Sequence, residues 1–137
     1  MNPKIYIASR YSSKKDVQQK KNELESKGFT VTSTWTEEGS ECNPGVGDST
    51  KEEGQPFAVR DIAEIDEADL LVFLSVDPTI PTVRGGRHVE FGYALGTGKM
   101  LAVVGPYENI FHYLADVTVH DTWAEFVQAL EVGDYEV

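Results

Sequence analysis

The chain has 137 residues, a formal net charge of −11 and a single cysteine, Cys42. This length suits one domain, residues 1–137, whose core is large enough to need neither disulfide nor metal. The negative charge repels phosphate backbones, so we expect no nucleic-acid partner. There is no signal-peptide pattern, and no apolar run approaches the ~18 residues of a membrane span. We therefore expect a cytoplasmic protein that binds no membrane.

The predicted elements alternate between strands and helices. Residues 4–9 are apolar enough for a buried parallel strand. A helix capped by Ser12 or Ser13 should run to about Ser26 and end at Gly28. The later elements expected are a strand over 29–35, a helix over 55–67, strands over 69–75, 100–104 and 117–119, and a helix over 123–130 capped by Asp121. This alternation predicts an α/β three-layer sandwich around a parallel, flavodoxin-like or Rossmann-like sheet of about five strands.

Two segments between these strands carry further expectations. Residues 36–54 are rich in Gly, Pro, Ser, Asn and acids, which favours a mobile flap over a pocket. In the helix that follows, Pro56 should lie in the first turn, and Ala58, Ile62 and Ile65 recur at helical spacing, so they should face the sheet.

The most informative stretch is Arg84-Gly-Gly-Arg-His-Val-Glu-Phe-Gly-Tyr-Ala-Leu-Gly-Thr-Gly-Lys99, between two apolar strands. In such crossover units ligands gather at the carboxyl ends of the strands. Gly85 and Gly86 permit a sharp turn there. Glu90 follows near the helix start, where the helix dipole should keep its carboxylate ionised and able to act as a nucleophile. Tyr93, three residues on, should reach this carboxylate.

The same stretch carries a family resemblance. Residues 86–99 resemble the signature of the nucleoside 2-deoxyribosyltransferase family, and residues 4–9, 60–69 and 104–113 resemble its other conserved segments. The resemblance implies that Glu90 attacks the sugar of a 2′-deoxynucleoside, breaks the N-glycosidic bond and passes the deoxyribosyl group to another nucleobase. It implies that Asp61 holds the base or gives it a proton. It also implies a homo-oligomer, a dimer or higher.

One departure from the transferase pattern favours an alternative. The transferases carry an extra Asp shortly before the Glu, whereas residues 79–88 hold no carboxylate and contain Arg84, Arg87 and His88 instead. Basic side chains and glycine amides at a helix N-terminus suit a phosphate. The alternative is therefore a 2′-deoxynucleoside 5′-monophosphate N-hydrolase, as in related proteins. A second alternative is a non-catalytic nucleotide-binding module.

The remaining candidates follow other strands. Ser9, Arg10 and Tyr11 come directly after the first strand, in a ligand loop by topology. Tyr11 is the candidate for orienting Glu90, although the sequence leaves open which of Tyr6 and Tyr11 points inward. The mid-strand position of Tyr6 favours the core. Asp77, after the third strand, is a further candidate for substrate binding. The acids Glu64, Asp66 and Glu67 are expected on a solvated face. No Cys, His and Asp group has metal-ligand spacing, so we expect no metal and no cofactor, only a small-molecule nucleoside or nucleotide.

Overall fold

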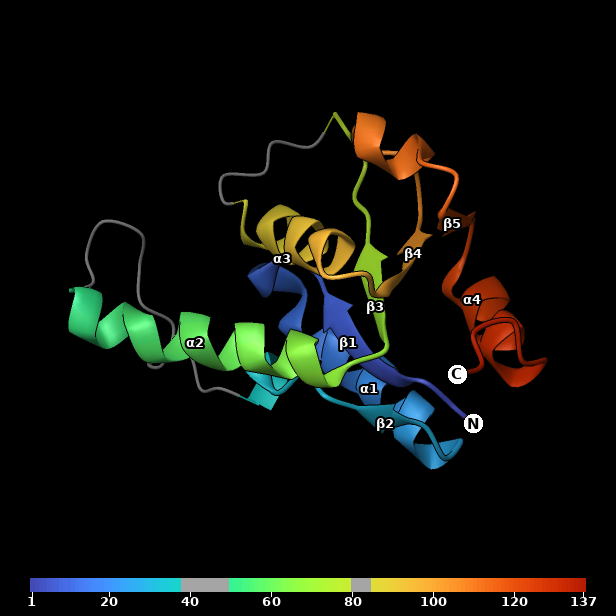
Figure 1. Ribbon diagram of the computed structural model, residues 1–137, viewed down its shortest axis with the longest axis horizontal. Helices are drawn as coiled ribbons and strands as arrows, with labels where there is room; N and C mark the ends of the chain where they lie inside the picture. The colour runs from blue at the N-terminus through green and yellow to red at the C-terminus, as the bar shows by residue number, and fades with distance from the viewer. Residues whose placement is uncertain (38–49, 80–84) are drawn as a thin grey trace.

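The computed structural model describes residues 1–37, 50–79 and 85–137. Five strands form one parallel sheet in the order β2-β1-β3-β4-β5 (Figure 1). Their bounds are β1 Lys4–Ala8, β2 Thr30–Val31, β3 Leu70–Leu74, β4 Met100–Val104 and β5 Val117–His120. This is the flavodoxin-like order, in which ligands bind where the strand order reverses, between β1 and β3. The predicted fold class is confirmed.

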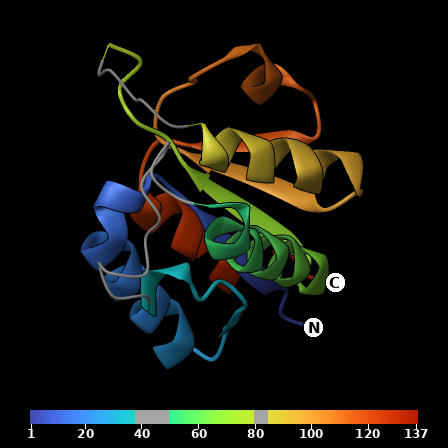
Figure 2. The same ribbon diagram turned by 90° about the vertical axis from the view of Figure 1, so that its left-hand side faces the viewer.

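Helices cover both faces of the sheet. Helices α2 (Lys51–Glu67) and α3 (Gly86–Gly96) pack together on one face, while α1 (Lys14–Ser26) and α4 (Trp123–Glu131) lie on the other (Figures 1 and 2). The Trp123 indole of α4 donates to Glu23 of α1 at 3.0 Å. Every residue of β3 is buried, as expected of a central strand covered on both sides. Because both faces of the sheet are covered, a ligand site is expected at the carboxyl ends of the strands, where the loops leave the sheet.

The second strand is shorter than predicted. It covers only Thr30–Val31. The Thr32 amide still donates to the Ile5 carbonyl of β1 at 2.7 Å, but side chains from Thr32 onward bond to other parts of the chain. The Thr32 hydroxyl donates to the Glu64 carbonyl at 2.8 Å, and the Trp35 indole donates to the Ile7 carbonyl at 2.9 Å. A short 3-10 helix, η2 (Trp35–Glu37), follows. The polar and aromatic residues that favour a strand thus anchor a turn instead.

Helix α2 starts earlier than predicted and extends past the sheet. Thr50 and Glu53 form a capping box at its N-terminus, so Pro56 lies inside the helix rather than in its first turn. Ile65 is buried but Ala58 is exposed, because the first half of α2 projects beyond the sheet (Figure 1). At the far end of the chain, Thr122 rather than Asp121 caps α4, its hydroxyl accepting the Glu125 amide at 3.2 Å.

Several predicted features fall outside the described residues. They are Arg84, Cys42 and most of the expected flap, residues 38–49. Within the described part of the chain, no helix is both long enough and apolar enough to cross a membrane.

Candidate functional site

Helix α3 places Glu90 against the sheet. Its buried stripe is Arg87, Phe91 and Ala94, at the i, i+4, i+7 spacing of a helix face that packs on a core. Glu90 is adjacent to this stripe and is therefore only partly exposed. Gly85 is the N-cap of α3 and Gly86 its first residue, both exposed, so the helix begins at the turn that the two glycines predicted.

The partner of Glu90 is Tyr6. Tyr6 is fully buried in β1, and its hydroxyl donates a hydrogen bond to Glu90 Oε2. The expected place of Tyr6 in the core is confirmed. The contact with Glu90 that was expected of Tyr11 is made by Tyr6 instead. Tyr11 lies outside the strand, packs on Trp35 with ring centroids 6.1 Å apart, and accepts from Lys14 Nζ at 3.1 Å. A usable signal was present, because a buried tyrosine hydroxyl normally needs a polar partner.

The contact expected of Tyr93 also differs. Its hydroxyl donates to Asp66 Oδ1 at 2.6 Å and does not bond to Glu90. The packing of α3 against α2 brings Asp66 within its reach, whereas Glu90 is turned toward β1. Tyr93 thus ties the two helices together beside the site.

The Glu90 carboxyl has an unusual proton affinity. Burial raises its pKa from 4.5 to about 8, and the nearby charges of Asp61 and Glu64 add to this. The Tyr6 hydrogen bond and the Arg60 charge lower the pKa but do not offset burial. The expectation that the helix dipole keeps Glu90 ionised is therefore wrong. Glu90 is the fifth residue of α3, beyond the first turn where the dipole acts.

Helix α2 supplies the charges that face Glu90. The Arg60 guanidinium pairs with Asp61, Nη2 to Oδ1, at 2.8 Å. Asp61 also raises the pKa of Tyr6, so it lies within electrostatic reach of both members of the Tyr6–Glu90 pair. Glu64 is not part of a solvated face as predicted. Its carboxylate accepts the Thr34 amide at 3.0 Å and the Thr34 hydroxyl at 2.6 Å.

A buried ion pair that sequence analysis did not foresee lies at the start of α3. Arg87 Nη1 donates to Glu108 Oε1 and Oε2 at 2.8 and 2.6 Å, and both side chains are less than a tenth exposed. His88 Nε2 lies 3.2 Å from Glu108 Oε2. Arg87 is thus inside the protein rather than on a surface open to a phosphate. Its place in the apolar stripe of α3 was the signal, because a buried cation needs an anion.

The remaining candidates lie apart from Glu90. Ser9 and Arg10 line a cavity of about 330 Å³ at the carboxyl ends of β1, β3 and β4, on the face covered by α1 and α4. Glu90 does not line this cavity. Arg10 Nε donates to Ser13 Oγ at 3.1 Å. Asp77 is exposed and accepts both the amide and the hydroxyl of Thr79, at 2.9 and 2.8 Å.

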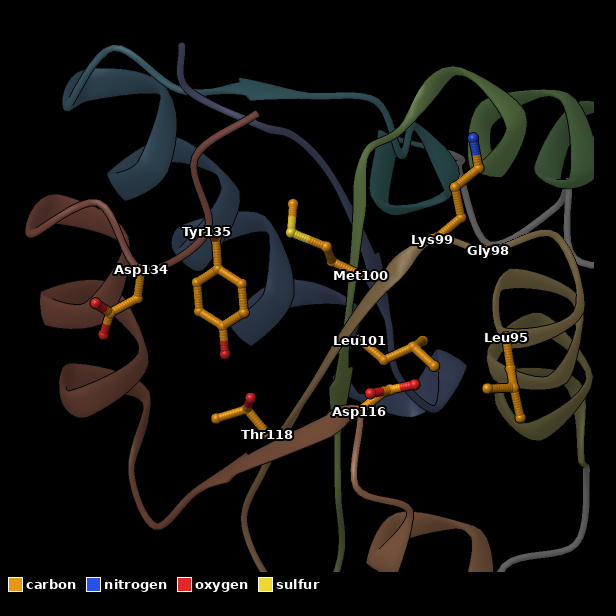
Figure 3. Close-up of a pocket in the computed structure, with 9 residues that line it drawn as sticks. All are labelled: Leu95, Gly98, Lys99, Met100, Leu101, Asp116, Thr118, Asp134 and Tyr135. Carbon is orange, nitrogen blue, oxygen red and sulfur yellow. The ribbon is translucent and has the colours of Figure 1, made fainter.

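A second cavity, of about 390 Å³, lies at the other end of the sheet. Its lining includes Lys99 and Met100 at the start of β4, and Tyr135 near the C-terminus (Figure 3). Ligands of parallel sheets bind at the carboxyl ends of strands, so this cavity is not our candidate site. Among the described residues, no group of three metal-ligating side chains is close enough to hold an ion.

Comparisons with known proteins bear on the fold. No protein-family model matches the sequence, and neither does any curated protein. Among solved structures, the CMP N-glycosidase BcmB of Clostridium botulinum matches with a TM-score of 0.59 and 20% identity, over 93% of this chain and 98% of that one. The chain has the fold of this N-glycosidase. At 20% identity this likeness shows the fold alone, and it agrees with the fold that the motif resemblance implies.

Proposed function

We propose that this protein cleaves the N-glycosidic bond of a nucleoside or nucleoside 5′-monophosphate, with Glu90 as the nucleophile. The observation that carries the proposal is the partly buried Glu90 carboxyl, which accepts a hydrogen bond from Tyr6 inside the α2/α3 face of a flavodoxin-like sheet. A carboxyl with a raised pKa, close to charged neighbours, is a frequent mark of a catalytic site. The N-glycosidase activity named for the structural neighbour agrees with this chemistry.

The reaction follows the scheme of a retaining glycosidase. As the bond between C1′ and the base nitrogen breaks, its electron pair leaves with the base and positive charge develops on the sugar ring. Glu90 must first lose its proton, because its pKa of about 8 makes the ionised form the minor one at neutral pH. A Glu90 carboxylate oxygen then bonds to C1′. Water, or a second base, attacks C1′ and releases the carboxylate. The departing base takes up a proton from Asp61, the donor that the resemblance implies, or from another acid. To donate, Asp61 has to be protonated, whereas in the free protein it is paired with Arg60.

Tyr6 has a defined part in this scheme. Its hydroxyl occupies one carboxyl oxygen of Glu90, Oε2, so the other oxygen is the one available to attack. The hydrogen bond also favours the ionised carboxylate over the acid, as its lowering effect on the Glu90 pKa indicates. We therefore assign Tyr6, rather than Tyr11, the role of orienting the nucleophile.

Hydrolysis of a monophosphate is the form of the reaction that we favour over deoxyribosyl transfer. Residues 79–88 lack the carboxylate expected of the transferases, and the structural neighbour is named for its action on a nucleotide, CMP. Transfer between bases stays a prediction from the resemblance. The same pocket supports either reaction, and the exclusion of water decides between them.

One assay separates these functions. Purified protein is incubated with deoxynucleosides and their 5′-monophosphates, with and without a second free base, and products are separated by chromatography. Free base and free sugar phosphate alone indicate the hydrolase. A new nucleoside that forms only when the second base is present indicates the transferase. Binding of a nucleotide without any release of base would contradict both enzymatic functions and support the non-catalytic nucleotide-binding module.

Substitution of Tyr6 should slow the reaction without abolishing it. Tyr6→Phe removes the hydroxyl that donates to Glu90 but keeps the buried ring. Loss of one hydrogen bond to a charged group costs about 1.5–3 kcal/mol, so kcat/KM should fall roughly tenfold to a hundredfold. The pH at which kcat/KM reaches half its maximum should rise, because the bond lowers the pKa of Glu90. Tyr11→Phe is the matched control and should change kcat/KM less than threefold, within about 0.7 kcal/mol.

Preference for a 5′-phosphate tests the basic residues near α3. If Arg84 and His88 bind the phosphate, kcat/KM for a monophosphate should exceed that for its nucleoside by at least about tenfold. The preference should collapse in Arg84→Ala and His88→Ala. Lys99→Ala, at the opposite end of α3, is the control. Equal kcat/KM values for the monophosphate and its nucleoside in the wild type would contradict a phosphate-binding site formed by these residues.

A further inference from the structure

Glu108 connects three segments around the start of α3. Besides Arg87 and His88 of that helix, its carboxylate accepts the Val76 amide at 2.7 Å, in the loop that follows β3. Glu108 itself lies in the loop that follows β4. One carboxylate thus joins the loops after two neighbouring strands to the first turn of the helix that carries Glu90.

The surroundings keep this carboxylate fixed. The Glu108 amide donates to Nδ1 of His112, which is buried, at 3.0 Å. The His112 ring packs edge-on against Phe73 of β3, with centroids 4.9 Å apart, and the Arg87 guanidinium lies 5.0 Å above the same Phe73 ring. Burial raises the pKa of Glu108, but the Val76 amide and the Arg87 charge outweigh it, so Glu108 is ionised near neutral pH.

Arg87 and Glu90 are three residues apart on one helix, so they lie on the same side of α3. A shift of Arg87 therefore carries Glu90 with it. Arg87 Nε and Nη2 already have no hydrogen-bond partner among the described residues, which makes Glu108 the one anion paired with this buried cation there. Without Glu108 the guanidinium would be a buried, uncompensated charge, a strongly unfavourable state that movement of the first turn toward water relieves.

We propose that Glu108 is a positioning residue that, through Arg87, His88 and the Val76 amide, holds the first turn of α3 so that Glu90 meets Tyr6. The inference rests on the proposed function only where it concerns turnover. The position of Glu90 against Tyr6 is a property of the folded protein and is measurable without any substrate.

The test follows the Glu90 carboxyl and the Tyr6 ring by carbon-13 NMR during pH titration. The signals are assigned with Glu90→Gln and Tyr6→Phe. The variants are Glu108→Ala, which removes every contact of the carboxylate, and Glu108→Gln, which keeps an acceptor for the Val76 amide but loses the charge. Glu131→Gln, in an exposed ion pair with Lys27 on the far face of the sheet, is the matched control. The other groups that face Glu90 are unchanged in all three variants: Tyr6 of β1 and Arg60, Asp61 and Glu64 of α2.

We expect the pKa of Glu90 to fall by about one unit or more in Glu108→Ala, toward its ordinary value, as the carboxyl leaves its buried place. The Tyr6 signal should shift with it, Glu108→Gln should give a smaller change, and Glu131→Gln none. If base release is found, kcat should drop roughly tenfold to a hundredfold in Glu108→Ala with KM nearly unchanged. If Glu108→Ala does not fold, Glu108→Gln decides. A folded variant in which neither the Glu90 nor the Tyr6 signal moves would overturn the proposal, whether or not the protein releases base.

Discussion

Glu90→Gln should abolish base release while the protein stays folded. The amide matches the carboxylate in size and still accepts the Tyr6 hydrogen bond, but it cannot form the covalent bond to C1′. We expect kcat to fall by at least about a thousandfold, or roughly 4 kcal/mol of barrier. Base release is measured by chromatography under single-turnover conditions, and the fold is checked by circular dichroism.

The control for this variant is Glu131→Gln, which makes the same chemical change in an exposed ion pair of α4. It should keep the wild-type rate. Glu90→Ala should match Glu90→Gln in activity. A Glu90→Gln protein that retains activity within a few-fold of wild type would show that another group attacks the sugar, and the assignment of the nucleophile would fail.

The same substitution should stabilise the protein at high pH. The pKa of Glu90 is about 8 in the folded protein against an ordinary value of 4.5. Between these values the folded state holds a proton that the unfolded state has lost, so wild-type stability falls as pH rises. The loss is about 1.4 kcal/mol for each unit that separates the two pKa values. Glu90→Gln carries no such group, so its advantage over wild type should be absent at pH 4 and largest above pH 8.

Urea denaturation of wild type and Glu90→Gln across this pH range measures the difference in the free energy of unfolding. Glu131→Gln again serves as the control for the loss of one carboxylate from an acidic protein. A stability difference between wild type and Glu90→Gln that stays constant from pH 4 to pH 9 would mean that Glu90 is an ordinary solvated carboxyl. Together with the activity of the variant, this measurement separates a buried catalytic carboxyl from a surface one.

The sequence by itself predicted the fold class, which is confirmed, and singled out Glu90 as the candidate nucleophile, which stays a prediction. Apolar strands alternating with helical segments are enough to predict a parallel α/β sheet, because local periodicity and the rules of strand connection leave few other arrangements. The glycine turn before Glu90 marked the start of α3 for a similar reason, since it depends only on neighbouring residues. Predictions of the less regular boundaries were wrong where distant groups decide them. The end of β2 is an example, because the residues that follow it bond to the carbonyls of Glu64 and Ile7.

The partners of the site came only from the tertiary structure. Tyr6 and Glu90 are 84 residues apart, and no periodicity relates a residue in the middle of β1 to one in α3. The pairing of Arg87 with Glu108 depends on the parallel pairing of β3 and β4, which brings the loops that follow them together. The proton affinity of Glu90 was misjudged for the same reason. A helix position suggests an ionised carboxylate, whereas the pKa is set mainly by burial and by charges on α2.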